Sequence, residues 1–282
     1  MLRDDLNHPV VSGNKLHKLA PNIELAKANH CTGALSFGGP YSNHLHALAW
    51  ACKDAGLAST GIVRGELQEA LTPTLLDCRA WGMTLVACSR KDYRAYQDTL
   101  SQQAAPCFAN DLPPEWVQGN PKKTLVIPEG GSNAIAIESL ATAYKTALAQ
   151  PDGRDITHIV CPTGTGATLT GVLNAAPTHI KLIGMQAVAE GDATLRRIEQ
   201  WYGGSAENLT IQACHLGRFG KITTELKTFI GEFEREFGIP LDPVYNGKAM
   251  LELTKMIDAG HFNTEDTLLF IHTGGLQGKR HA

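Results

Sequence analysis

The chain has 282 residues, of which 43% are hydrophobic and 19% are charged, and its formal net charge is −3. This length and composition are typical of a globular protein with one large domain or two smaller ones. The 25 basic and 28 acidic residues are interspersed, which argues against a nucleic-acid partner. Because we find neither a membrane-length apolar run nor a secretory leader, we expect a cytoplasmic protein with no membrane partner.

Seven cysteines are scattered along the chain, and none forms a CxxC pair. An odd number without patterned spacing argues against a disulfide framework or a structural zinc site. We expect most of these cysteines to be small buried hydrophobic residues. His44 and His46 are two positions apart on an expected helix and point in different directions, so we expect no metal site there.

Short apolar runs alternate with longer amphipathic stretches from residue 33 onward. The expected strands are 33–37, 60–63, 84–87, 124–127, 156–161, 181–188, 209–213 and 267–271. The expected helices are 42–56, 73–81, 91–103, 133–150, one that follows residue 168, 193–201, 223–237 and 247–259. Residues 104–122 contain four prolines and are expected to form a loop. Strands that alternate with helices predict an α/β fold with parallel sheets covered on both faces.

One lysine near the N-terminus stands in an unusual local sequence. Lys15 follows Gly13 and Asn14, which tolerate turn conformations that other residues resist, and precedes an apolar helical run. Such a turn directs the lysine amine, which can then act as a Schiff-base nucleophile if its surroundings favour the neutral form. The alternative is an ordinary solvated lysine on a helix surface.

Four glycine-bearing loops follow expected strands, at 38–44, 130–133, 164–168 and 272–275. Ligands of open α/β sheets bind beyond the carboxyl ends of the strands. Residues 163–168 have small side chains that let backbone N–H groups converge before a helix, which favours one phosphate group. The loop lacks the Gly-Lys-Ser/Thr ending of a Walker loop, and Leu169 breaks a dinucleotide fingerprint. A tight turn without a ligand remains the alternative.

Two further turns carry polar groups. Ser42 or Asn43 is suited to cap the next helix, or their amide groups could bind a carboxylate and a ligand. The Asp242-Pro243 turn places Tyr245 and Asn246 at the start of a helix, where Tyr245 either packs or contacts a ligand. A reactive lysine, a phosphate site and an asparagine loop on an α/β fold together suggest pyridoxal phosphate as the cofactor.

Several motifs, in order along nearly the whole chain, resemble one family of enzymes. They are Arg3-Asp4-Asp5, residues 13–19 (GNKLHKL), residues 38–44 (GGPYSNH) and residues 242–248 (DPVYNGK). The chain resembles the D-cysteine desulfhydrase / 1-aminocyclopropane-1-carboxylate (ACC) deaminase family, whose fold is tryptophan-synthase-β-like. The resemblance implies two open, twisted, mostly parallel-sheet domains with the cofactor in the cleft between them. The smaller domain would be 20–122, the larger 1–19 plus 123–282, and the protein a homodimer.

The resemblance also implies a role for each matching residue. Lys15 would hold the cofactor covalently, and Asn43 would bond the hydroxyl group of its ring. Ser42, with the neighbouring N–H groups of Asn43 and His44, would receive the substrate carboxylate, and Tyr245 would lie against the substrate. Asn246 would stand in the place of the partner of the ring nitrogen. The cofactor phosphate would bind a loop of five residues: Gly164, Thr165, Gly166, Ala167 and Thr168.

Departures from the family pattern favour one activity over the other. ACC deaminases carry a glutamate at the position of Asn246 and a tyrosine at that of Phe219. A neutral amide keeps the cofactor ring protonated less well than a carboxylate, and opening a cyclopropane demands more of the ring than β-elimination does. His17 also replaces the usual arginine. The segment that normally precedes Arg3 is absent, which indicates a short variant or a misassigned start.

We therefore expect a pyridoxal-phosphate-dependent lyase that acts on a small amino acid. The favoured reaction is D-cysteine desulfhydrase-like β-elimination, which yields pyruvate, ammonia and sulfide. The alternative within the fold is an ACC deaminase that yields 2-oxobutanoate and ammonia. More remote alternatives are a Rossmann-like nucleotide-binding protein or oxidoreductase and a cofactor-binding protein that has lost catalysis.

Overall fold

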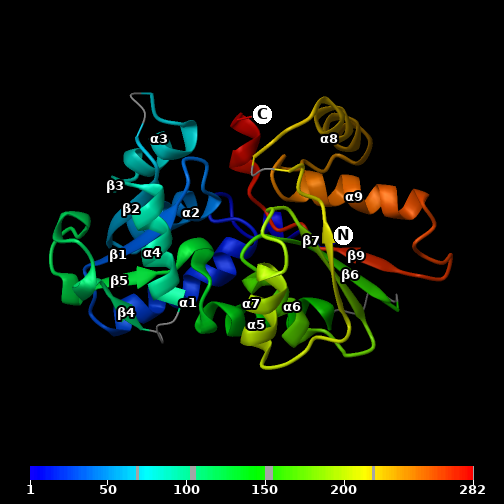
Figure 1. Ribbon diagram of the computed structural model, residues 1–282, viewed down its shortest axis with the longest axis horizontal. Helices are drawn as coiled ribbons and strands as arrows, with labels where there is room; N and C mark the ends of the chain where they lie inside the picture. The colour runs from blue at the N-terminus through cyan, green and yellow to red at the C-terminus, as the bar shows by residue number, and fades with distance from the viewer. Residues whose placement is uncertain (68–69, 102–105, 150–154, 218–219, 282) are drawn as a thin grey trace. The chain divides into compact units, whose positions relative to one another are not determined.

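The computed structural model describes residues 1–67, 70–101, 106–149, 155–217 and 220–281 (Figure 1). The chain divides into two compact units. The first comprises residues 1–7, 12–14 and 137–282, and the second comprises residues 8–11 and 15–136. None of the helices in the described ranges is long and apolar enough to span a membrane.

The second unit is built on a five-stranded sheet in the order β3-β2-β1-β5-β4. Its central strand β1 is buried along its whole length and runs parallel to both neighbours, as expected for a sheet covered on two faces. The edge strand β4 pairs antiparallel with β5. The strands are β1 (Gly33–Gly38), β2 (Ala58–Arg64), β3 (Met83–Cys88), β4 (Cys107–Phe108) and β5 (Thr124–Ile127).

Side-chain caps define where two helices of this unit begin. Ser42 Oγ accepts a hydrogen bond from Leu45 N at 3.2 Å, and Thr72 Oγ1 caps the next helix in the same way. The helices are α1 (Asn14–Ala28), α2 (Asn43–Asp54), α3 (Pro73–Ala80) and α4 (Arg90–Ser101), and the short 3₁₀ turns are η2 (Ala109–Asp111), η3 (Pro114–Trp116), η4 (Pro121–Lys123) and η5 (Glu129–Gly131). Ser42 is therefore the N-cap of α2.

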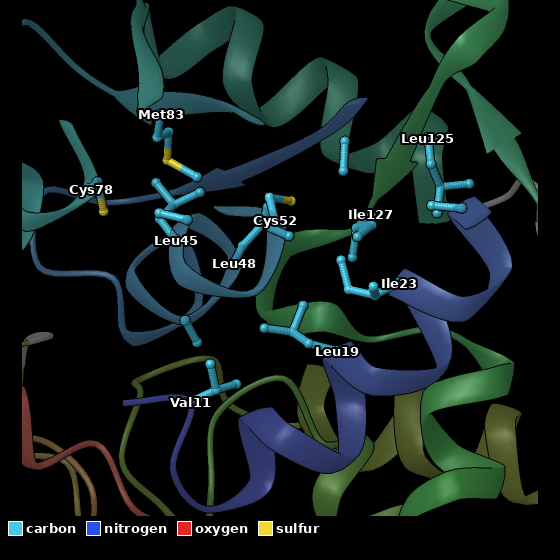
Figure 2. Close-up of a cluster of buried hydrophobic side chains, with 14 of the residues drawn as sticks. Val11, Leu19, Ile23, Leu45, Leu48, Cys52, Cys78, Met83, Leu125 and Ile127 are labelled. Atoms are coloured by element: carbon cyan, nitrogen blue, oxygen red, sulfur yellow. The ribbon is translucent and has the colours of Figure 1, made fainter. Parts of the chain in front are cut away.

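Leucine and cysteine side chains of α2 fill the core between this helix and the sheet. Leu45, Leu48 and Cys52 recur at helical spacing and are fully buried. Figure 2 shows them together with Met83 of β3 and Ile127 of β5. Because these apolar side chains come from both the helix and the sheet, their burial holds the start of α2 at the carboxyl end of β1.

The first unit is built on a parallel four-stranded sheet in the order β8-β7-β6-β9. Strand β6 is buried along its whole length, and apolar residues of α5, α6 and α9 pack within this unit. The strands are β6 (His158–Thr163), β7 (Lys181–Gln186), β8 (Leu209–Ala213) and β9 (Leu268–Phe270). The helices are α5 (Ala134–Leu148), α6 (Ala167–Ala175), α7 (Ala193–Tyr202), α8 (Thr224–Phe237) and α9 (Asn246–Asp258), with 3₁₀ turns η1 (Asp4–Leu6) and η6 (Leu276–His281).

The α/β fold class with two mostly parallel sheets is confirmed. The strand expected from residue 156 begins at His158, and the one expected to 188 ends at Gln186.

The loop expected over 104–122 contains β4, a strand of two residues, too short to show periodicity. The ends expected for two helices at 103 and 150 lie outside the described residues. Six of the seven cysteines are buried, as predicted. The domain boundaries at 19/20 and 122/123 stay a prediction.

Candidate active site

The carboxyl ends of neighbouring strands bring the glycine-bearing loops together within each unit. In the first unit, residues 164–168 follow β6 and residues 272–275 follow β9, and these two strands pair. In the second unit, residues 38–44 follow β1 and residues 130–133 follow β5, which also pair. Each unit therefore carries a pair of loops at one edge of its sheet, where α/β proteins bind ligands.

The loop of residues 164–168 turns tightly into the N-terminus of α6. Gly166 is the N-cap and has φ +96°, a conformation that favours glycine, and no side chain caps the helix. A Cβ at Gly166 would lie 2.9 Å from Ile198 Cγ1, so the loop lies directly on α7. The first N–H groups of a helix have no intrahelical acceptor and attract anions. Thr163 Oγ1 is also buried with no hydrogen-bond partner in the described part of the chain. These donors fit one phosphate group.

Asn14 joins the residue before Lys15 to this loop. Its Nδ2 donates to Thr168 Oγ1 at 2.9 Å, which leaves the hydroxyl hydrogen of Thr168 to be donated to another acceptor. Its backbone N–H donates to Thr273 O at 3.2 Å. Gly13, with φ +66°, lies against the same carbonyl, since a Cβ there would be 2.0 Å from Thr273 O. The Gly-Asn turn is therefore held in place by residues far along the chain.

Arg197 of α7 supports the loop from its other side. The guanidinium Nε donates to Thr165 O at 3.2 Å, and an Nη pairs with the carboxylate of Glu190. Gln186 Nε2 donates to Gly191 O at 2.9 Å, which holds the turn between Glu190 and α7. The backbone of Thr165 is thus fixed by a charged side chain, which the spacing of the loop residues did not indicate.

The Asp242-Pro243 turn is organised by a buried carboxylate. Asp242 is fully buried and its Oδ2 accepts from the N–H groups of Val244 and Tyr245 at 2.9 and 2.8 Å. Its Oδ1 accepts from the N–H of Asn246 at 2.9 Å. A buried carboxylate needs such donors, and here they are the backbone amides of the turn and of the first residue of α9. The turn predicted by Asp-Pro is confirmed.

Asn246 uses its side-chain amide entirely within the first unit. Nδ2 donates to Asp242 Oδ1 at 2.6 Å and to Gly274 O at 2.8 Å, while Oδ1 accepts from Thr273 N at 2.9 Å. Both amide hydrogens are committed and Oδ1 also accepts from Thr273 Oγ1 at 3.4 Å, so the side chain keeps no amide hydrogen for a ligand. The same bonds hold residues 273–274 beside the start of α9.

Tyr245 precedes α9 and packs on the glycine-rich loop. A Cβ at Gly164 would lie 3.1 Å from Tyr245 Cε1 and 3.4 Å from its hydroxyl oxygen. Any larger residue at 164 would displace the ring. The half-buried tyrosine thus borders the phosphate loop, as a residue that contacts a ligand there would.

In the second unit, the loop after β1 presents Ser42 and Asn43 at the first turn of α2. Both are partly exposed, whereas His44 is buried. Ser36 Oγ lies 2.7 Å from His44 Nε2.

Lys15 is partly exposed on α1 and Lys18, one turn later, is buried. Phe219, which the family pattern places in the pocket, lies outside the described residues.

Sequence reasoning missed the partners of the candidate residues rather than the residues themselves. The role of the Asp242 carboxylate could have been found, because an aspartate in a turn often accepts hydrogen bonds from backbone N–H groups two or three residues on. Thr273 and Arg197 carry no local signal, since they act across more than 25 residues of chain. The missed residues are Asn14 as a hydrogen-bond donor, Ser36, Arg197, Asp242 and Thr273.

The sequence profile of the pyridoxal-phosphate dependent enzyme family matches residues 2–274. The chain belongs to this family. Its relatives include a putative ACC deaminase of Pyrococcus horikoshii, 28% identical over 99% of this chain and 85% of the relative. The bifunctional mitochondrial D-cysteine desulfhydrase/ACC deaminase of Arabidopsis thaliana is 29% identical over 98% of this chain and 72% of its own length. A D-cysteine desulfhydrase of Salmonella schwarzengrund is 26% identical over 97% and 85%.

A solved structure described as an ACC deaminase homologue has a TM-score of 0.78 and 27% identity, and covers 99% of this chain and 85% of its own. A cystathionine beta-synthase of Helicobacter pylori, with a TM-score of 0.65 and 15% identity over 99% and 86%, shows the shared fold. The predicted family and its cofactor, pyridoxal phosphate, are confirmed.

The residues present fit this cofactor. The uncapped start of α6 suits its phosphate, and so does the Thr163 hydroxyl, which is buried without a hydrogen-bond partner in the described part of the chain. When bound, pyridoxal phosphate draws electrons from the α-carbon of an amino acid. The chain's own residues must then hold the substrate and move its proton.

Proposed function

We propose that the protein is a lyase that releases pyruvate, ammonia and sulfide from D-cysteine or a similar β-substituted amino acid. One molecule of water enters for each substrate, so the atoms balance. The relatives named D-cysteine desulfhydrase support the substrate class, and the family supports the cofactor.

In this proposal Lys15 would hold the cofactor through its aldehyde, and Lys15 Nζ would accept the α-proton of the substrate. Ser42 and the N–H groups of Asn43 and His44 receive the substrate carboxylate, since the first turn of α2 favours an anion. The Asn43 amide bonds the ring hydroxyl of the cofactor. Tyr245 contacts the substrate, and residues 164–168 hold the cofactor phosphate.

The bonding of Asn246 is the observation that carries the choice of reaction. Asn246 is the proposed partner of the cofactor's ring nitrogen, and its two amide hydrogens are committed to Asp242 and Gly274. Its side chain is uncharged, and a neutral amide stabilises a protonated ring less than a carboxylate does. Elimination of a thiol from the β-carbon is less demanding of the cofactor than opening a cyclopropane.

The second candidate is ACC deaminase, which converts its substrate and one water into 2-oxobutanoate and ammonia. Relatives carrying that name favour it. The two reactions give different keto acids, so the products distinguish them without reference to rates.

The test is a panel of amino acids, including both enantiomers of cysteine and ACC, offered to cofactor-loaded protein. Pyruvate and sulfide from D-cysteine would support the proposal, whereas 2-oxobutanoate from ACC alone would overturn it in favour of the second candidate. Lys15→Ala should abolish both turnover and the visible absorbance of bound cofactor. Lys27→Ala changes an exposed lysine of the same helix, paired only with Glu24 at 2.9 Å among its described contacts, and should retain both.

We also propose a cytoplasmic homodimer. Seven cysteines with no CxxC pair suit a reducing compartment. The dimer is supported by the family resemblance, and light scattering of the purified protein would test it: a mass near 30.3 kDa would contradict it.

A further inference from the structure

One nitrogen of the buried His44 ring has no hydrogen-bond partner among the residues that the structure describes. The residue is 3% exposed, and the unpartnered atom is Nδ1. A buried polar atom left without a partner costs free energy, and such atoms concentrate where a protein uses them. The missing hydrogen-bond partner of His44 Nδ1 therefore needs a physical explanation.

Ser36 determines which nitrogen of the ring carries the hydrogen. Its Oγ lies 2.6 Å from Ile127 O and 2.7 Å from His44 Nε2. A backbone carbonyl can only accept, so the single hydroxyl hydrogen of Ser36 goes to Ile127. The serine oxygen must then accept from Nε2–H of His44. It follows that Nδ1 carries a lone pair and acts only as an acceptor.

The Nδ1 edge of the ring borders helix α1. A Cβ added at Gly131 would lie 3.2 Å from Lys18 Cβ, 3.3 Å from His44 Cε1 and 3.5 Å from His44 Nδ1. The ring edge and the stem of Lys18 thus border the same small space. Lys15 is three residues earlier and lies on the same face of the helix. His44 Nδ1 therefore borders the face of α1 that carries Lys18 and, one turn earlier, Lys15.

The ring also stays neutral. Burial lowers the pKa of His44 well below its ordinary value of 6.5, and the charges of Lys15 and, less strongly, Lys18 lower it further. A neutral imidazole beside two ammonium groups can accept a hydrogen bond from either without adding positive charge. Of the two lysine charges, that of Lys15 acts more strongly on the ring.

We propose that His44 is a positioning residue whose Nδ1 accepts a hydrogen bond from the Lys15 amine and directs it, with Ser36 holding the required tautomer. The inference rests on the proposed role of Lys15 as the cofactor lysine. It gives the His44 side chain a task separate from that of its backbone N–H, which is proposed to face the substrate carboxylate. It also explains the use of a buried serine on β1.

Nitrogen-15 NMR of the cofactor-loaded protein, labelled at histidine, tests the tautomer directly. The resonances of His44 are assigned by their loss in His44→Gln. We expect Nε2 to carry the hydrogen and Nδ1 to show the shift of an unprotonated nitrogen. A hydrogen on Nδ1 overturns the inference. Because no turnover is measured, this result is independent of which amino acid the enzyme uses.

A pair of variants tests whether the acceptor matters. In His44→Asn the side-chain amide replaces Nδ1, the proposed acceptor. In His44→Gln the amide replaces Nε2, the nitrogen that bonds Ser36. We expect kcat to fall about threefold in the first and about 30-fold in the second, with KM nearly unchanged. Equal losses, or the reverse order, would show that His44 serves only its contact with Ser36 and would overturn the inference.

Ser36→Ala and a control on the same helix complete the experiment. Ser36→Ala leaves the ring free to adopt the other tautomer, so we expect part of the His44 signal to move to the Nδ1–H form. An unchanged spectrum contradicts the role of Ser36.

The control, His46→Gln, alters a buried histidine whose Nε2 pairs with Asp77 of α3 at 3.0 Å, and it should leave kcat unchanged. If all proteins retain the visible absorbance of bound cofactor but none uses D-cysteine, the proposed function fails while the NMR result still stands.

Discussion

Asn14 Nδ2 donates a hydrogen bond to Thr168 Oγ1 at 2.9 Å, across 154 positions of chain. Asn14 immediately precedes Lys15, and Thr168 lies in the first turn of α6, at the end of the proposed phosphate loop. The bond therefore anchors the residue next to the proposed cofactor lysine to the loop proposed to hold the phosphate. A cofactor attached at its aldehyde and at its phosphate needs these two points held at a fixed separation.

Removing this bond should weaken cofactor binding more than it weakens folding. A hydrogen bond of this kind contributes about 1 kcal/mol, so we expect Asn14→Ala to raise the dissociation constant of pyridoxal phosphate about fivefold. Titration followed by the visible absorbance of bound cofactor measures this constant. Asn29→Ala provides the control, because Asn29 bonds only the exposed end of α1 at Leu25 O in the described contacts. An equal effect of both substitutions would contradict the role of Asn14.

Gly13 and Gly56 form a matched pair for testing the turn before Lys15. Both have positive φ, +66° and +69°, but an added Cβ meets Thr273 O at 2.0 Å at the first position and nothing within 4 Å at the second. Gly56→Ala should cost about 1 kcal/mol of unfolding free energy from backbone strain alone. Gly13→Ala adds a steric clash with the backbone and should cost about 3 kcal/mol. Urea denaturation measures both, and similar losses would show that residues 13 and 273 do not approach closely.

His44 should make the protein less stable in acid. Its pKa is lowered in the folded state, so between that value and 6.5 the unfolded chain binds a proton that the folded chain does not. Stability conferred by the neutral ring is present above pH 6.5 and is lost as pH falls below it. For this single group the loss between pH 7.5 and 5.5 is about 1.4 kcal/mol.

The measurement compares urea denaturation of the wild type and His44→Asn at these two pH values. The variant has no group that titrates at this position, so its loss of stability should be smaller by about 1.4 kcal/mol. Other histidines contribute equally to both proteins and cancel in the difference. Parallel losses in the two proteins would indicate that folding does not lower the pKa of His44.

The alternation of strands and helices follows from hydrophobic periodicity, which is a local property of the chain. For that reason β1, α2 and the glycine-bearing loops could be located from the sequence, and so could the caps at Ser42 and the turn at Asp242. The unusual setting of Lys15 was visible for the same reason, since Gly13 and Asn14 are its neighbours. Strand β4 could not be located, because two residues at a sheet edge are formed by pairing with β5 rather than by their own pattern.

The sequence by itself determined the fold class, the family and the candidate lysine. Only the tertiary structure showed that Asn14 bonds Thr168, that the amide of Asn246 is committed to Asp242 and Gly274, and that Ser36 bonds the His44 ring. Apart from the bond between Asn246 and Asp242, each of these depends on a hydrogen bond between different elements. Such bonds have direction and short range, so they exist only once packing has brought their donors and acceptors within about 3 Å.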